Sequence, residues 1–236
     1  MFITTKGIVL RTYPFKDNKL IVKLFTKDDG LISSIVKKNR SQIILSELLT
    51  MAEITYKKPR NGSLCYIKEC RVDYVYKSIP VCQQKISCAM ILCDILNKCL
   101  QEVSVDLYEF IANSFKELDS QKQHTPSFKN LFLIKFCDIM GIGPLNGLQD
   151  INNSVLSIKE GRYICNSSVL NKKDIIPLNE SREIRILSSL DFNDLEQHMI
   201  ELNLNSSVFN YLISYISVHL TDLTRLKSLK VLKEMI

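Results

Sequence analysis

The side chains of this chain with the clearest chemical potential are the lysines and arginines of its first third. Residues 1–80 carry 15 Lys and Arg against 7 Asp and Glu, a net charge of +8, whereas the remaining residues carry 16 against 18. Clustered cations bind phosphates because each neutralised phosphate releases a condensed counterion, so this bias indicates a module that binds polyanions. The residues that we expect to bind nucleic acid are Arg11, Lys19, Lys23, Lys37, Lys38, Arg40, Lys57, Lys58 and Arg60.

Aromatic residues are interleaved with these cations. Exposed rings stack on unpaired bases, and such stacking would add a contact that phosphate binding lacks. The alternative is that the rings fill a core while the lysines only keep the protein soluble, and for any single ring we favour the core. For Lys37, Lys38 and Arg40 together we favour a nucleic-acid contact, because the cluster follows the charge bias of the whole segment. The rings concerned are Tyr13, Phe15, Phe25, Tyr56, Tyr66, Tyr74 and Tyr76.

Metal binding is the next chemistry to consider, because the chain has eight cysteines. No CxxC pair occurs, and the four cysteines of residues 82–99 follow one another at six, five and six residues, which matches no tetrahedral zinc motif. Cys65 and Cys70 lie an odd number of residues apart in one expected strand, so we expect them on opposite faces and unable to share an ion. The three histidines are isolated in the sequence. We therefore expect no metal, and cysteines that fill the core as small hydrophobic residues.

No catalytic or nucleotide-binding motif is visible either. The loop GIGPLNG at 141–147 follows an expected helix instead of a strand and contains Pro144, so it predicts a helix terminator and not a dinucleotide site. Asp28 and Asp29 lie in an expected turn, where solvated acids are common. Lys6 interrupts the opening apolar residues, and no apolar run approaches the ~18 residues of a membrane span. We expect a reduced, cytoplasmic protein that is not an enzyme, needs no cofactor and contacts no membrane.

The elements that must position the cations are short strands. Their β-branched residues alternate with turns rich in Pro, Asp, Asn and Gly, and no long helix intervenes. Five such strands predict a small closed barrel of the OB-fold type, and an open sheet covered by the later helices is the alternative. In the last strand we expect one face to be half-solvated, because it carries Cys65 and Ile67 together with Glu69, Arg71 and Asp73. The expected strands span residues 3–12, 19–26, 31–38, 49–57 and 64–76.

After Pro80 the pattern becomes helical. Apolar residues recur at spacings of three and four, and the third helix ends at Gly141, with Pro144 as a further stop. Residues 145–178 predict a surface excursion that contains a β-hairpin, VLSIKEGRYIC, with its turn at Glu160 and Gly161. We therefore expect an α+β protein with two domains, a barrel at 1–80 and a mostly helical domain at 81–236. The expected helices span about 83–102, 105–120, 127–140, 180–190, 191–202 and 206–221.

Three stretches resemble the RecO family of bacterial recombination mediators. The opening KGIVLRTYPFKDNKLIVKLFTKDDGLISSIVKK is the most specific of them, and FCDIMGIGPLN and YISVHLTDLTRLKSLKVLKEM are similar to the family's central and C-terminal helices. Several relatives carry a four-cysteine zinc site after the central helix. Here that region holds only Cys165, with Cys137 before it, so the resemblance implies an excursion without zinc that its own hairpin must hold.

The resemblance implies an OB-fold followed by a helical domain, with no enzymatic activity. Family members bind single- and double-stranded DNA, anneal complementary strands, and act with RecR to load recombinase onto strands coated by single-stranded-DNA-binding protein. Their helical domain receives the acidic C-terminal tail of that coating protein, and the cations that we connect with this tail are Arg225, Lys227 and Lys230. We expect this role in the cytoplasm, at the nucleoid. The alternative is an adaptor whose basic barrel binds acidic peptides, with DNA binding secondary.

Overall fold

The computed structural model describes residues 1–59, 64–100, 103–122, 125–144, 153–165, 174–195 and 206–226. One compact unit contains Met1–Ser120, and a second contains Gln121–Lys227. The expected domain boundary near residue 80 marks the change from strands to helices. That residue 80 is also a boundary between domains stays a prediction.

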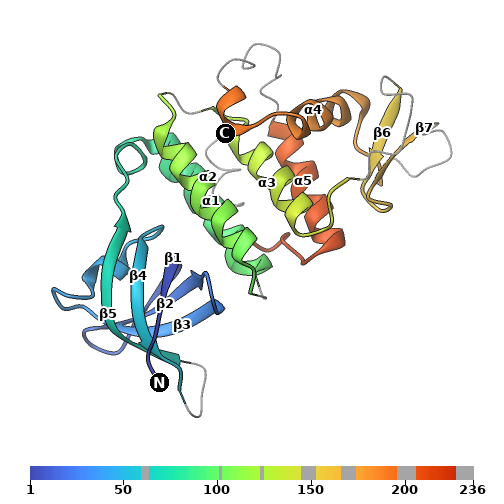
Figure 1. Cartoon of the computed structure of the whole chain (residues 1–236). Coiled ribbons are helices and arrows are strands. Elements are labelled where there is room, and N and C mark those ends of the chain that lie inside the picture. Colours follow the sequence, from blue (N-terminus) through green and yellow to red (C-terminus); the bar gives the residue numbers. More distant parts are fainter. Residues whose placement is uncertain are drawn as a thin grey trace. The chain divides into compact units, whose positions relative to one another are not determined.

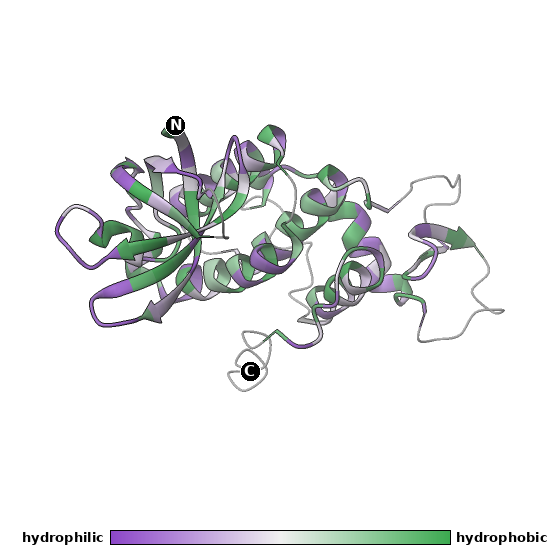
Figure 2. Ribbon diagram, turned by 90° about the horizontal axis from the view of Figure 1, so that it is seen from below, coloured by the Kyte–Doolittle hydropathy of each residue, from purple (hydrophilic) through white to green (hydrophobic). Residues whose placement is uncertain are grey.

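The first unit begins with a five-stranded barrel (Figure 1). Its strands follow the order β1-β2-β3-β5-β4 around a closed sheet, in which β3 and β5 are parallel and every other pair is antiparallel. This closure confirms the predicted barrel over the open sheet, and the strand ends agree with prediction to within three residues. Figure 2 shows the connections between strands as mainly hydrophilic. The strands are β1 (Ile3–Phe15), β2 (Lys19–Thr26), β3 (Gly30–Lys37), β4 (Met51–Lys57) and β5 (Leu64–Tyr74).

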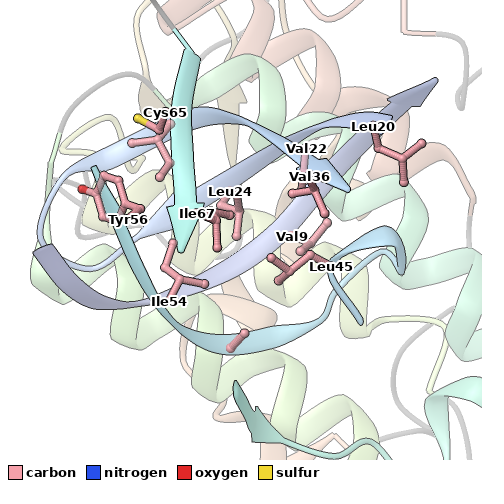
Figure 3. Packing of buried hydrophobic residues seen from close by; sticks show 12 residues of the cluster. Val9, Leu20, Val22, Leu24, Val36, Leu45, Ile54, Tyr56, Cys65 and Ile67 are labelled. Carbon is pink, nitrogen blue, oxygen red and sulfur yellow. The ribbon is translucent and has the colours of Figure 1, made fainter. Parts of the chain in front are cut away.

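The barrel interior is filled by every second residue of its strands, as the two-residue period of a strand requires. In β3 the side chains of Ile32, Ser34 and Val36 are buried, while the residues between them are half-exposed. Leu45, from the short 3-10 helix η1 (Ile43–Ser46), adds a fully buried side chain to this core. Figure 3 shows these side chains converging from different strands. The core consists of Val9, Leu20, Val22, Leu24, Ile32, Val36, Leu45, Ala52, Ile54, Tyr56, Cys65 and Ile67.

A bulge in β5 overturns the prediction for its faces. Thr55 pairs with Glu69 and Tyr56 with Ile67, so Lys68 has no partner on β4. An extra residue shifts the alternation by one position. Cys65 and Ile67 therefore belong to the core, and Cys70 also packs against it although it lies an odd number of residues from Cys65. The expectation that the two cysteines lie on opposite faces was therefore wrong, whereas Glu69, Arg71 and Asp73 are exposed, as the expected half-solvated face requires.

Two helices complete the first unit: α1 (Gln83–Cys99) and α2 (Val105–Ser120). They are anchored to the barrel by ion pairs, with Arg11 of β1 contacting Asp94 and Lys27 contacting Glu109. The 3-10 helix η2 (Ile79–Val81) lies between β5 and α1. Asp119, near the end of α2, binds this connection through its carboxylate. Neither α1 nor any other described helix is long and apolar enough to cross a membrane.

The second unit is mostly helical and carries the predicted hairpin. Strands β6 (Ser154–Ser157) and β7 (Arg162–Cys165) pair across a turn in which Gly161 has φ +65°, a left-handed conformation that glycine adopts without a Cβ clash. The helix α3 ends before Gly141, whose φ is +71°, as the sequence predicted. Of the expected helix at 191–202, the described part, which ends at residue 195, contains a short 3-10 helix, and the rest of that prediction lies outside the described residues. The helical elements are α3 (Phe128–Ile139), α4 (Leu178–Ser188), η4 (Phe192–Asp194) and α5 (Ser206–His219).

The hairpin is held by the helices as well as by its own pairing. His219 of α5 makes a 2.6 Å hydrogen bond with the carbonyl of Ile158. Ser181 of α4 accepts a bond from the Leu156 N–H through its hydroxyl, at 3.0 Å, and its carbonyl accepts one from the Tyr163 hydroxyl. These contacts correct the expectation that the hairpin alone holds the excursion. They also give one of the isolated histidines a structural role.

Candidate nucleic-acid interface

One row of outward-facing side chains crosses the barrel at right angles to its strands. The register places Tyr13 of β1 beside Ile21 of β2, and Ile21 beside Ile35 of β3. Ile35 lies beside Tyr66 of β5, which in turn lies beside Lys57 of β4. Neighbouring side chains in such a row are ~5 Å apart. We call these five residues the central row.

Cations lie on both sides of the central row, one outward position further along each strand, which is a step of ~6.7 Å. On one side, Phe15 pairs with Lys19 and Lys19 pairs with Lys37. On the other side, Arg11 pairs with Lys23. The barrel therefore presents aromatic and aliphatic side chains between two groups of cations. Bases can contact such a row while the adjoining phosphates meet the cations.

The loop after β3 is fixed by a buried glutamine, and it carries two more cations. Gln42 is 7% exposed. Its side-chain oxygen accepts a hydrogen bond from the Lys37 N–H at 3.0 Å, and its side-chain nitrogen donates one to the Ile67 carbonyl at 2.8 Å. The Lys38 N–H donates to the Asn18 carbonyl at 2.9 Å. This anchoring holds the exposed side chains of the loop next to the Lys19 and Lys37 pair.

The lysines of this face and Arg40 differ in their ion pairing from three cations elsewhere on the barrel. Lys6 contacts Asp73 at 2.8 Å, an interaction that raises the pKa of Lys6, and Arg71 contacts Glu53 at 3.2 Å. Lys68 likewise contacts its neighbour Glu69. Among the described residues, by contrast, no carboxylate lies within ion-pair distance of Lys19, Lys23, Lys37, Lys38, Arg40 or Lys57. Cations without an internal partner are available to an external anion.

Two of the predicted cations are already paired. Arg11 contacts Asp94 at 3.2 Å, and its guanidinium lies 5.1 Å from the centre of the Tyr13 ring. Lys58 contacts Asp29, which also accepts a hydrogen bond from the Tyr56 hydroxyl. A phosphate would have to compete with these carboxylates. Arg60, Lys227 and Lys230 lie outside the described residues, and Arg225 is an exposed residue of the second unit.

The aromatic rings that are interleaved with the cations differ in how far they are buried, which the sequence alone did not decide. Phe25 and Tyr56 are fully buried, so for these two the core interpretation is confirmed. Tyr66 is 55% exposed, and Tyr13 is half-buried in the same row. Tyr74 and Tyr76 line an apolar groove of about 620 Å³ that the sequence did not reveal. Its walls come from η1 and the loop after it, the end of β5 and α1.

Two buried thiols of α1 are unsuited to act as nucleophiles. Burial raises the pKa of the Cys99 thiol to about 12, and it raises that of Cys93 as well. A thiol with such a pKa stays protonated near neutral pH and is inert. The described residues also contain no group of three or more His, Cys, Asp and Glu side chains placed to hold a metal ion.

Comparison with known proteins gives a consistent result along the whole chain. Residues 1–75 match the family model described as Recombination protein O N terminal, a span that coincides with the barrel. The chain is 27% identical over 245 residues to the DNA repair protein RecO of Christiangramia forsetii, covering 99% of each chain. It is 26% identical over 251 residues to that of Phocaeicola vulgatus, covering 100% of this chain and 99% of the relative. The corresponding protein of Porphyromonas gingivalis is 25% identical over 241 residues.

Proposed function

Because the chain belongs to the RecO family, we propose that it acts in DNA repair and recombination as a DNA-binding mediator without enzymatic activity. In this proposal it binds single- and double-stranded DNA through the barrel and anneals complementary strands. No metal and no nucleotide cofactor takes part. The place of action is the cytoplasm, at the nucleoid.

The observation that carries the proposal is the group of unpaired cations on one face of the barrel. Lys19, at the start of β2, lies beside Lys37 at the end of β3, and Lys38 and Arg40 follow in the loop that Gln42 anchors. Two complementary strands repel each other through their phosphates, and this repulsion slows their encounter. A surface that neutralises phosphates on both strands lowers the repulsion, so annealing needs no hydrolysis of a nucleotide.

Two protein partners belong to the proposal. We propose that RecR and the acidic C-terminal tail of the single-stranded-DNA-binding protein bind this chain, so that recombinase is loaded onto coated strands. Support comes from the family resemblance along the full chain. Arg225, exposed near the end of the described part of the second unit, is a cation that suits an acidic tail, and Lys227 and Lys230 are proposed to assist it.

Annealing of complementary oligonucleotides in the absence of ATP and magnesium tests the proposal. One strand carries a fluorophore and the other a quencher, and the reaction is run with and without the single-stranded-DNA-binding protein. We expect this chain to accelerate annealing in both cases, without cleaving either strand. If the protein fails to bind a bare oligonucleotide at physiological salt, the proposal is wrong and the basic face is better explained as a receptor for acidic peptides.

A further inference from the structure

Tyr66 has an unusual position among the aromatic residues of the barrel. It lies on β5, between the half-buried Ile35 on β3 and the exposed Lys57 on β4, and 55% of its surface is exposed. Among the described residues, no hydrogen bond involves its hydroxyl. Its Cα partners on the neighbouring strands are Ile35 and Lys57, and more than half of its surface faces solvent. A large ring that neither fills the core nor satisfies a polar partner leaves its π face open to a ligand.

Tyr66 lies at one end of a continuous series of aromatic and aliphatic side chains in the central row. From Tyr13 on β1 to Tyr66 on β5 the row crosses three strand spacings, which is ~14 Å. Ile21 and Ile35 lie between the two tyrosines, so the row is continuously aromatic or aliphatic. That length exceeds a single base and therefore fits consecutive nucleotides of one strand.

The cations on both sides of the central row indicate which class of ligand can bind there. Lys19 and Lys37 lie on one side of the row, and Lys23 lies on the other with Arg11 beside it. An apolar peptide would leave the three lysines without an anionic partner, whereas a polyanion with flat apolar groups satisfies both the cations and the rings. Unpaired nucleic acid has this combination.

Resting on the proposed DNA binding, we infer that the central row is a track for the unpaired bases of a single strand, with Tyr66 as its principal stacking residue. The strand crosses the barrel from β1 towards β5, and its phosphates contact the flanking cations. Tyr13 contributes less, because the guanidinium of Arg11 lies 5.1 Å from the centre of its ring. In a duplex the bases are already stacked and paired, so a duplex contacts the cations and not the rings. Tyr66 therefore distinguishes single strands from duplexes on a surface whose cations bind both.

Equilibrium binding to three probes of equal length tests the inference: oligothymidine, an abasic single strand, and a duplex. Tyr66→Ala is expected to weaken binding of oligothymidine by about 5- to 150-fold, the range for loss of stacking on one base. Binding of the abasic strand and of the duplex is expected to change less than twofold, since their contacts are to phosphate. Tyr66→Phe keeps the ring and is expected to bind like the unaltered protein. Tyr211→Ala, in the second unit, is the matched control and should change none of the three.

The outcomes separate this inference from the proposed function. Equal weakening on all three probes would overturn the stacking role of Tyr66 while leaving DNA binding intact. The same holds if Tyr66→Phe is as defective as Tyr66→Ala, because the ring would then not be the group that matters. Failure of the unaltered protein to bind any of the probes would overturn the proposed function itself. Urea unfolding of each variant shows whether the fold is retained.

Discussion

Neutralising Lys37, Lys38 and Arg40 together tests whether the proposed DNA binding depends on these cations. Replacing each by Gln lowers the net charge of the chain from +6 to +3. Each cation that neutralises one phosphate of a single strand contributes about 0.7 to the slope of log affinity against log salt, so three contribute about 2. Between 50 and 200 mM salt, the unaltered protein should therefore lose about 20-fold more affinity than the variant. The fold should survive, because all three side chains are exposed and Gln42 binds the backbone of Lys37.

A second triple variant provides the matched control. Lys6, Lys68 and Arg71 are also barrel cations, and replacing each by Gln gives the same net charge of +3. Their ammonium and guanidinium groups contact Asp73, Glu69 and Glu53, so a phosphate would have to compete with these carboxylates. We expect this variant to keep the salt slope of the unaltered protein to within about one phosphate contact.

Fluorescence anisotropy of a labelled oligothymidine, measured at four or more salt concentrations, gives the slopes of all three proteins. The reasoning requires a difference of about 2 between the two triple variants. If both variants show the same slope, net charge governs binding and the position of the cations does not, which would refute the assignment of this face.

Two further predictions concern the helices that pack on the barrel. Replacing Asp94 by Asn removes the carboxylate that competes for Arg11, and should strengthen binding of single strands and steepen the salt slope by about 0.7; an unchanged slope in the anisotropy titration would show that Arg11 contacts no phosphate. Burial pushes the pKa of Asp119 upward, but hydrogen bonds from the backbone N–H groups of residues 77–79 and from the Tyr74 hydroxyl outweigh it and hold that pKa below 3.8. The stabilisation is thus complete above about pH 5 and is lost as the pH falls below about 4. Replacing Asp119 by Asn should cost about 2 to 3 kcal/mol of unfolding free energy at pH 7 and less at pH 3; a cost in urea unfolding that does not depend on pH would contradict the role of the charge.

Local patterns were sufficient for the elements of the barrel and the hairpin. A strand can be recognised in the sequence by its alternating apolar and polar residues and by the turn residues on either side of it. The ends of the five strands could therefore be predicted to within three residues. The turn at Gly161 and the end of α3 before Gly141 were likewise predictable, because both need a left-handed backbone conformation that glycine adopts readily.

The faces of β5 were not predictable in this way. The charged Lys68 interrupts the alternation of this segment, but only its missing partner on β4 shows that it is a bulge, and only the tertiary structure shows that Cys65 and Cys70 both contact the core. A bulge is a property of two strands, since the extra residue exists only relative to a partner.

The sequence by itself determined the kind of molecule: a β-barrel and helices, with the positive charge concentrated on the barrel. Both follow from the order of residues along the chain, because alternation and charge are local properties. Tertiary structure decided which of those charges are available. Asp94, on a helix more than 80 residues away in the chain, pairs with Arg11, and the parallel pairing of β3 with β5 brings Tyr66 beside Ile35. Contacts between such distant positions depend on closure of the barrel and packing of the helices, which no local pattern records.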